Sequence, residues 1–453
     1  MPVTEKPDII FLIRAYNDMD IQMSFIAALA EEGRFNVRII GYPCDGDMGS
    51  PGSHEAAQYM RDKYGVSFET VLDKAPAPFH LRLMYKVERM IAPLRHKPWA
   101  QNSIVSNMLK VVHLAMLVPM RKMLKGTLPW LKEIADEWSP LFINCDEAIC
   151  QKGRAYMLDE IVRGKADSGV PVYIIKTGND TYLDTNPNKA IPLEERLASM
   201  NYQKSPATRY IVPCHLDQNS AHENFPEETP EIHGNLRFDR SWVEKLHKDI
   251  LVPPYMDKKS YMDKLPQSAG PKVVFMLSKL GYGIKVDELK DSIKLVSGMD
   301  GVACAIKPHT RGMKFDFMDP AALEGTVIVP DVPSALLIEW ADILLFTGSS
   351  IAFHAMILNK RVGFLQNAQY IPTIFDDGVS CDKFDTNAEL KAFLENWREN
   401  GEPEVSKDIQ AARLKWQADN IHGGLESGLT AQHYKELYLG DLGLLDMKKR
   451  KAS

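Results

Sequence analysis

Three features of the 453-residue sequence predict an α/β protein made of two tandem domains, each a parallel sheet wrapped by helices. The chain is about twice as long as one hydrophobic core supports. Its 45% hydrophobic and 25% charged residues are typical of a globular protein and exclude a largely disordered or collagen-like chain. Short apolar runs alternate with longer amphipathic ones through both halves, as in repeated βα units.

The first half holds six apolar runs that we expect to be strands, with helices in most of the gaps. The segment MPVTEKPDIIFLI has acidic residues before a short apolar run and no small-residue cleavage site, so it reads as a first strand and not as a signal peptide. The six expected strands are Asp8 to Ile13, Val37 to Tyr42, Phe68 to Leu72, Leu141 to Cys145, Val170 to Ile175 and Tyr210 to Pro213.

A helical stretch inside this half, at about residues 80–135, is unusually basic. From His80 to Lys132 it carries ten Lys and Arg residues against a single acid, Glu88, interleaved with Leu, Met and Trp. Such a region in an acidic protein suggests contact with an anionic membrane surface or a lipid-linked acceptor. The alternative is a helical layer packed on the first domain with its lysines in water.

A helix through Ile250 and a proline-rich, charged stretch from Val252 to Ser260 suit the end of a domain and a linker. We therefore expect an N-terminal domain over residues 1–250, a C-terminal domain over 268–400, and helices with a basic tail over 401–453. The strands expected in the second domain are Lys272 to Leu277, Val302 to Ile306, Thr326 to Val329, Ile343 to Phe346 and Arg361 to Leu365.

The amino-acid composition limits which binding partners and which cellular compartment we expect for this protein. A net charge of -6 argues against nucleic acid as the partner. The six cysteines have no paired spacing that suggests zinc or a disulfide framework, so we expect them reduced, in a cytoplasmic protein. No stretch reaches the ~20 apolar residues of a spanning helix, so any membrane contact is expected to be peripheral, at the inner face.

The segment from Ala341 to Leu365 reads as strand, tight polar turn, helix and strand. Gly348 permits the turn, and Ser349 or Ser350 supplies the helix cap. Free amides, the helix dipole and two hydroxyls there form a site for an anionic oxygen. Any βα turn favours a Gly-Ser cap, however, so this turn alone does not establish the site.

Two other loops of the second domain are expected at the same sheet edge, where ligands of parallel sheets bind. The second strand ends in AIKPHTRG, which places Lys307, His309 and Arg311 within five residues. A diphosphate would offset this positive charge; a solvated turn is the alternative. The loop SKLGYG, beginning at Ser278, has glycines that let a backbone approach a ligand closely.

Three segments resemble a known group of proteins. GNLRFDRSW, from Gly234 to Trp242, resembles the Gly-Asn-Pro-Arg-Phe-Asp run that ends the N-terminal domain of glycosyltransferases with the GT-B fold. KPHTRG resembles their Lys/Arg-x-His-Pro loop, and TGSSIAFHAMILNKRVGFL resembles their Ser-Ser-x-x-x-Glu-Ala helix and the strand after it. From about Leu141 to Arg398 the chain is thus similar to the bacterial surface-polysaccharide and teichoic-acid group, which includes CDP-glycerol glycerophosphotransferases and capsule Kdo transferases.

The resemblance implies two Rossmann-like domains facing each other across a cleft, with the nucleotide diphosphate on the C-terminal domain and the acceptor on the N-terminal one. Asn235 and Arg237 then lie at the hinge. The alternative is that they form a turn before a helix, in which Asp239 caps the helix and Arg237 pairs locally. The residues expected to bind the donor are Ser278, Lys307, His309, Arg311, Gly348, Ser349, Ser350, Asn235 and Arg237.

The sequence also departs from that group. Lys176, Thr177 and Gly178 stand where many relatives carry His-Gly, so a base cannot be carried over from that histidine. His354 stands where an acidic residue commonly holds the donor ribose or sugar, so the donor is not identified either.

An inverting transfer needs a general base on the wall opposite the donor phosphates. Asp146 and Glu147 directly follow the expected strand LFINC, and we favour them as catalytic residues. Other acidic residues that could act as the base follow the first two strands. For each of these acids, the alternative to a catalytic role is helix capping or solvation. Asp18 in particular resembles the cap of the helix through Leu29. The rivals are Asp18, Asp20, Asp45 and Asp47.

The sequence therefore predicts a nucleotide-sugar-dependent glycosyltransferase that acts on a surface or capsular polysaccharide or its lipid-linked precursor, with no metal and no other cofactor. The alternatives are a CDP-alditol phosphotransferase, a non-hydrolysing UDP-N-acetylglucosamine 2-epimerase, and a non-catalytic scaffold for envelope assembly. The sugar, the acceptor, the anomeric outcome and the oligomeric state stay open.

Overall fold

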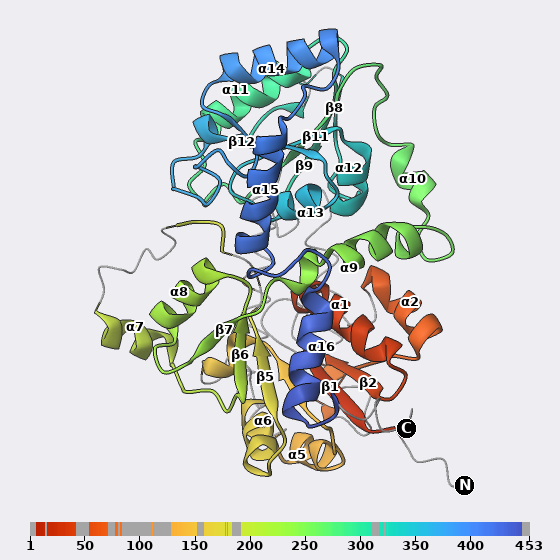
Figure 1. Ribbon diagram of the computed structural model, residues 1–453, viewed down its shortest axis with the longest axis vertical. Coiled ribbons are helices and arrows are strands. Elements are labelled where there is room, and N and C mark those ends of the chain that lie inside the picture. The colour runs from red at the N-terminus through yellow and green to blue at the C-terminus, as the bar shows by residue number, and fades with distance from the viewer. Residues whose placement is uncertain are drawn as a thin grey trace.

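The computed structural model describes residues 6–13, 16–41, 54–70, 78–79, 82–83, 111, 128–151, 158–176, 178, 180–183, 192–309, 315, 317–320, 323 and 325–445. Arg311, Asp45, Asp47, the basic tail and nearly all of the basic stretch at 80–135 lie outside these residues. Within them the chain forms two α/β layers, one above the other in Figure 1, each built on a parallel sheet.

The lower layer in Figure 1, which we call the N-domain, has a seven-stranded sheet of order β3-β2-β1-β4-β5-β6-β7, in which every pair is parallel. Its strands are β1 (Asp8–Ile13), β2 (Asn36–Gly41), β3 (Ser67–Thr70), β4 (Ile143–Cys145), β5 (Val172–Ile175), β6 (Arg209–Val212) and β7 (Pro230–Ile232). Its helices include α1 (Tyr16–Glu31), α2 (Glu55–Tyr64), α5 (Leu128–Asp136), α6 (Leu158–Asp167), α7 (Leu193–Met200) and α8 (His215–Asn224).

The upper layer, the C-domain, has a six-stranded parallel sheet of order β10-β9-β8-β11-β12-β13. Its strands are β8 (Lys272–Met276), β9 (Ala303–Lys307), β10 (Thr326–Ile328), β11 (Ile343–Phe346), β12 (Arg361–Leu365) and β13 (Asp382–Phe384). Its helices include α11 (Val286–Ser297), α12 (Ser334–Trp340), α13 (Ile351–Ile357), α14 (Asn387–Asn400) and α15 (Lys407–Asn420).

The expected fold class of two parallel-sheet α/β domains is confirmed. Every expected strand is present within two residues of its expected ends. Most of these runs are buried on both faces of their sheets, although β3 and β10, which lie at sheet edges, are half-buried. In β1, for example, Phe11 faces one core cluster and Leu12 faces the other. Two edge strands, β7 and β13, were not expected; each is three residues long, and β7 begins with a proline.

The chain passes between the domains twice. The first passage follows β7 through the short helices η6 (Leu236–Phe238), α9 (Arg240–Lys245), η7 (Leu246–Ile250) and α10 (Lys258–Met262). The second returns from α15 to the last helix, α16 (Thr430–Asp441). The two passages touch, since the amide of Asn235 donates to the carbonyl of Ile421 at 2.8 Å.

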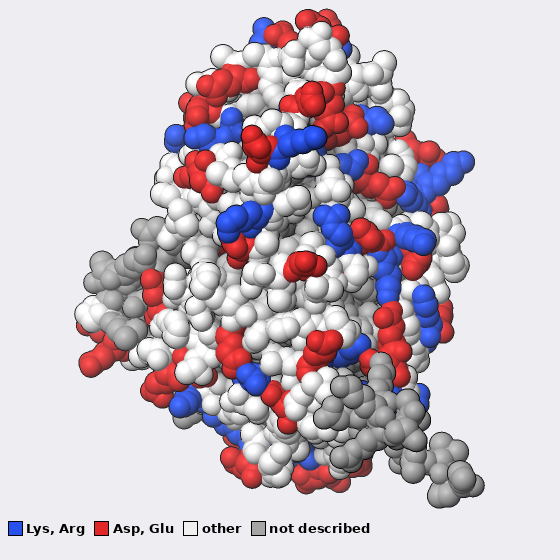
Figure 2. Space-filling model, viewed as in Figure 1, with Lys and Arg blue, Asp and Glu red and all other residues white. Residues whose placement is uncertain are grey.

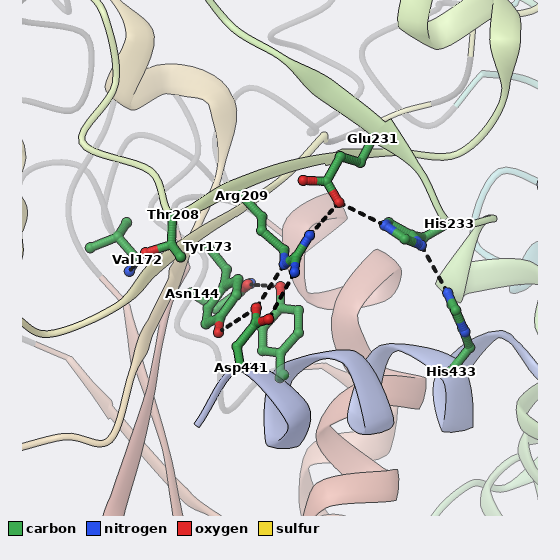
Figure 3. A network of polar contacts seen from close by, with 10 residues as sticks. Asn144, Val172, Tyr173, Thr208, Arg209, Glu231, His233, His433 and Asp441 are labelled. Carbon is green, nitrogen blue, oxygen red and sulfur yellow. Dashed lines mark hydrogen bonds and ion pairs between the residues drawn. The ribbon is translucent and has the colours of Figure 1, made fainter. Parts of the chain in front are cut away.

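Helix α16 packs on the N-domain, although it follows the whole C-domain in sequence (Figure 1). Tyr434 and Tyr438 are fully buried beside Phe25 of α1, and Tyr438 stacks on Tyr173 of β5 with ring centroids 3.7 Å apart. Polar contacts hold its end: Asp441 accepts hydrogen bonds from both Arg209 and Tyr173 (Figure 3). The N-domain core is thus completed by the end of the chain.

Candidate functional site

The loops after β5 and β11 meet where the two domains touch. Residues 180–183, which we call the crossing segment, follow β5 and reach the C-domain. The Thr181 hydroxyl donates to the carbonyl of Gly348 at 2.8 Å. The Leu183 amide donates to Pro372, the Thr181 carbonyl accepts from Ile374, and Tyr182 forms an antiparallel bridge with Thr373. A segment of the N-domain therefore lies directly on the turn predicted to bind phosphate.

The turn around Gly348 requires glycine for two reasons. Its φ is +50°, in the left-handed region, and a Cβ there would lie 2.7 Å from the hydroxyl oxygen of Tyr182. The Ser349 hydroxyl accepts a 3.5 Å hydrogen bond from the amide of Ile351 at the start of α13. Ser278, from the loop after β8, donates to the carbonyl of Thr347. The structure thus brings Ser278, Gly348, Ser349 and Ser350 together.

Lys307 lies at the same sheet edge but is engaged in the protein itself. Its Nζ donates to the carbonyls of Pro330 and Val332, each at 2.7 Å. Burial lowers the pKa of Lys307 to about 8, although Asp331 and Glu55 act in the opposite direction. Since Glu55 belongs to α2, Lys307 also lies near the N-domain.

His309 follows Lys307 at the edge and is half-buried. Strand β8 separates β9 from β11, so the two loops start about 10 Å apart. Their convergence on one diphosphate stays a prediction.

Asp20 and Arg237 form an ion pair at the domain junction, with 2.7 Å between the guanidinium and the carboxylate. Burial alone raises the pKa of Asp20, but Arg237 and His54 outweigh it and lower the pKa to about 2. A carboxylate with so low a pKa is a weak base, which disfavours Asp20 as the general base. The local pairing considered for Arg237 is wrong, because its partner lies in α1.

Of the acids considered as helix caps, Asp239 caps a helix and Asp18 does not. Asp239 caps α9 by accepting from the amides of Ser241 and Trp242, as considered, and Asn235 caps η6. Asp18 is not the cap of α1: the helix begins at Tyr16, so Asp18 lies inside its first turn.

Asp146 and Glu147 lie at the carboxyl end of β4, where the sequence places them. Asp146 is buried and caps the short helix η5 (Glu147–Cys150), since its Oδ1 accepts from the Ala148 amide at 3.1 Å. Glu147 accepts a 3.2 Å hydrogen bond from the hydroxyl of Tyr210 on β6. Capping is therefore one role of Asp146, and the catalytic role of either residue stays a prediction.

A buried ionic cluster lies at the carboxyl end of β5, around Lys176. The Nζ of Lys176 lies 2.6 Å from Asp217 of α8 and 2.5 Å from Asp180 of the crossing segment. Lys176 is 7% exposed and Asp217 is fully buried. Burial by itself lowers the pKa of Lys176, but the two carboxylates outweigh it and raise the pKa, so the lysine stays charged. The cluster anchors the crossing segment to the N-domain.

A hydrogen-bonded pair of histidines joins the linker to the C-domain. The Nε2 of His354, on α13, lies 2.9 Å from the Nε2 of His247, whose Nδ1 lies 3.1 Å from Glu339 of α12. Lys258 donates to the other oxygen of Glu339. Burial, His247 and Arg237 lower the pKa of His354 to about 3, against the opposing effect of Asp20. His354 is thus neutral at pH 7 and lies close to groups of both domains.

Sequence reasoning missed Tyr182, Thr347, His247 and Asp217. The available signal for Tyr182 was its place just after the Lys176 loop, at a strand end where ligands bind. Nothing in a single sequence indicates that it contacts a turn more than 160 residues away.

Among the described residues, no three His, Cys, Asp or Glu side chains are grouped so that they could hold a metal ion. No helix in the part of the chain that the structure describes is long and apolar enough to cross a membrane. On the face in Figure 2, acidic and basic side chains are interspersed over both domains, without a broad basic field.

No protein-family model matches the chain, and no curated protein matches it. Solved structures do. A UDP-GlcNAc 2-epimerase from Neisseria meningitidis, bound to UDP-GlcNAc, matches 96% of this chain and 100% of its own at 12% identity, with a TM-score of 0.53. A UDP-GlcNAc 2-epimerase from Methanocaldococcus jannaschii matches 95% of this chain and 98% of its own at 11% identity, with a TM-score of 0.51.

Glycosyltransferases are also among the matching structures. The glycosyltransferase of kitacinnamycin matches 96% of this chain and 99% of its own at 11% identity, with a TM-score of 0.47. Together with the two parallel-sheet domains, the matches to the two epimerases identify the GT-B fold. At such identities the likeness concerns the fold alone.

Proposed function

We propose that this protein is a glycosyltransferase that binds a nucleotide-sugar donor at the domain junction and transfers the sugar to a surface or capsular polysaccharide or a lipid-linked precursor. The observation that carries the proposal is the contact of the crossing segment with the Gly348 turn. Side chains of the N-domain therefore lie next to the turn that, in this proposal, binds the phosphates of the donor. The sequence motifs and a fold shared with nucleotide-sugar enzymes support the same reading.

In this proposal the Gly348 turn, with Ser278, Ser349 and Ser350, binds the donor diphosphate through hydroxyls and amides. His309 and Arg311 supply positive charge from the neighbouring loop. Asp146 or Glu147 takes the proton of the acceptor hydroxyl if the transfer inverts configuration. No metal is assigned a role.

The first experiment is a thermal-shift screen of the purified protein against UDP, GDP, CDP and CMP. A ligand that binds only the native state raises the melting temperature. We expect one diphosphate to do so, and His309→Gln to reduce that shift. If no nucleotide changes the melting temperature at millimolar concentration, the proposal is wrong.

A nucleotide-sugar 2-epimerase is the second candidate, because the GT-B fold is equally that of the matching epimerases. Product analysis separates the two activities. An epimerase converts its nucleotide sugar with no acceptor present, whereas a transferase releases nucleotide only when an acceptor is added. A CDP-alditol phosphotransferase would release CMP, and a non-catalytic scaffold would bind nucleotide without turnover.

The acceptor side of the proposal rests on the basic stretch at residues 80–135. Charge reversal at Arg121, Lys122 and Lys125 should reduce sedimentation of the protein with anionic liposomes. Unchanged sedimentation would remove membrane contact from the proposal and leave the donor assignment intact.

A further inference from the structure

Two buried hydroxyls beside Gly348 find no hydrogen-bond partner of normal geometry within the described residues. They are the phenol oxygen of Tyr182, from the N-domain, and the hydroxyl of Thr347, from the C-domain. Thr347 is only 1% exposed. Buried polar groups of native proteins are nearly always paired, so two such hydroxyls at one turn require an explanation.

The backbone fixes Tyr182 over the turn. Hydrogen bonds of Thr181 and Leu183 with the C-domain hold the residues on both sides of it. The ring of Tyr282 packs against the Tyr182 ring at 5.8 Å. The phenol oxygen therefore stays beside Gly348, 2.7 Å from the place that a Cβ would take.

Both hydroxyls are available as donors. Burial raises the pKa of Tyr182 to about 12, although a side-chain hydrogen-bond interaction with Ser278 acts in the opposite direction, so the phenol keeps its proton at neutral pH. The Ser278 hydroxyl already donates its own hydrogen bond to the Thr347 carbonyl. Two donors beside a glycine turn suit a ligand that offers several acceptor oxygens and few protons, which describes a diphosphate.

We propose that Tyr182 and Thr347 donate hydrogen bonds to the diphosphate of the nucleotide sugar, so that both domains hold this group at Gly348. This inference rests on the proposed function and deepens it. It adds an N-domain side chain to a binding site otherwise built from the C-domain and its preceding linker.

The test is Tyr182→Phe, which removes one oxygen and leaves the ring contacts in place. Calorimetric titration of the wild type and the variant uses UDP, GDP and CDP, together with uridine, guanosine and cytidine as probes that lack phosphate. For the diphosphate that binds the wild type, we expect the dissociation constant to rise about tenfold or more, as for the loss of a hydrogen bond to a charged group. The matching nucleoside should bind both proteins equally. Tyr282→Phe is the matched control, and its affinity should not change.

Melting of the ligand-free protein separates this role from a structural one. Because the phenol has no normal partner, Tyr182→Phe should not lower the melting temperature. A lower melting temperature of Tyr182→Phe with unchanged affinity for the diphosphate would overturn the inference. An equal loss of affinity for the diphosphate and for the nucleoside would overturn it as well. A wild type that binds no nucleotide would instead overturn the proposed function itself.

Discussion

Lys307 links the end of β9 to the loop that precedes α12 through its two hydrogen bonds to backbone carbonyls. Its charge suggested a phosphate ligand, but loss of its side chain would also leave two carbonyl groups unpaired. Activity of a Lys307→Ala variant would therefore mix a binding effect with a folding effect.

We expect Lys307→Met to lower the free energy of unfolding by about 1–3 kcal/mol, the cost of leaving a buried acceptor without its donor. Urea denaturation of the ligand-free protein measures this difference. Lys391→Met, at an exposed position of α14, is the control and should leave stability nearly unchanged. Equal stability of the two variants would show that the carbonyls find other partners.

Gly348 is the second residue whose replacement is informative. Gly348→Ala forces a left-handed φ on alanine, which costs about 1–2 kcal/mol, and drives its Cβ into Tyr182. The control is Gly33→Ala, which shares the positive φ but has no atom near its Cβ. We expect Gly348→Ala to destabilise the protein more than Gly33→Ala, as measured by urea denaturation, and to weaken nucleotide binding. If the two variants lose equal stability, the crossing segment is not fixed on the turn.

At the scale of elements, the His247–His354 pair joins the linker helix η7 to α13. One of the two facing nitrogens must accept, so both rings cannot be protonated while the hydrogen bond lasts. The charged and titratable groups around the pair are Glu339, Lys258 and Lys360 on the side of His247, and Asp20, Arg237 and His54 toward the N-domain.

The pair predicts a pH dependence of stability. The folded pKa of His354, about 3, is below its ordinary value of 6.5, so the unfolded chain binds a proton that the folded protein excludes. Stability from this group is complete above pH 6.5 and decreases as the pH falls toward 3. We expect the melting temperature of His354→Phe to depend less on pH between pH 6.5 and 4 than that of the wild type. His215→Gln, at an exposed histidine of α8, should keep the pH dependence of the wild type. An unchanged profile for His354→Phe would contradict this assignment.

Single elements could be predicted to the extent that their signal is local. Strands such as β1 and β11 could be predicted from unbroken apolar runs, because burial on both faces leaves no polar position in β11 and only the first residue, Asp8, in β1. The three-residue edge strands carry no such run. Helix α16 looks like any amphipathic helix, and only the folded chain shows that Tyr434 and Tyr438 belong to the N-domain core.

The candidate site divides in the same way. The Gly348 turn and the loop of Lys307 could be placed at one sheet edge, because parallel strands bring their carboxyl ends to the same side. The contact of Thr181 with Gly348 spans 167 residues and depends on how the two domains meet. The ion pair of Asp20 with Arg237 likewise joins α1 to η6. Local sequence patterns carry no information on such contacts.

For the whole molecule, removal of α16 should damage the domain that is farthest from it in sequence. A chain that ends at Leu429 loses Tyr434 and Tyr438 from the N-domain core, and each such large buried side chain contributes about 3–5 kcal/mol. We expect rapid proteolysis of the N-domain and survival of a C-domain fragment. The control is a chain that ends at Leu445, which keeps all of α16. Resistance of the shorter chain to protease would show that the N-domain core is stable without α16.

Placement of α16 also has a consequence for how the protein is made. In most multidomain proteins the N-terminal domain can fold during synthesis, while the ribosome is still adding later residues. Here the apolar face that α16 covers in the N-domain stays exposed until the ribosome has synthesised the C-domain and then α16 itself. The order of synthesis and the order of completion are therefore opposite, and a stalled or truncated product would expose the older half to chaperones and proteases.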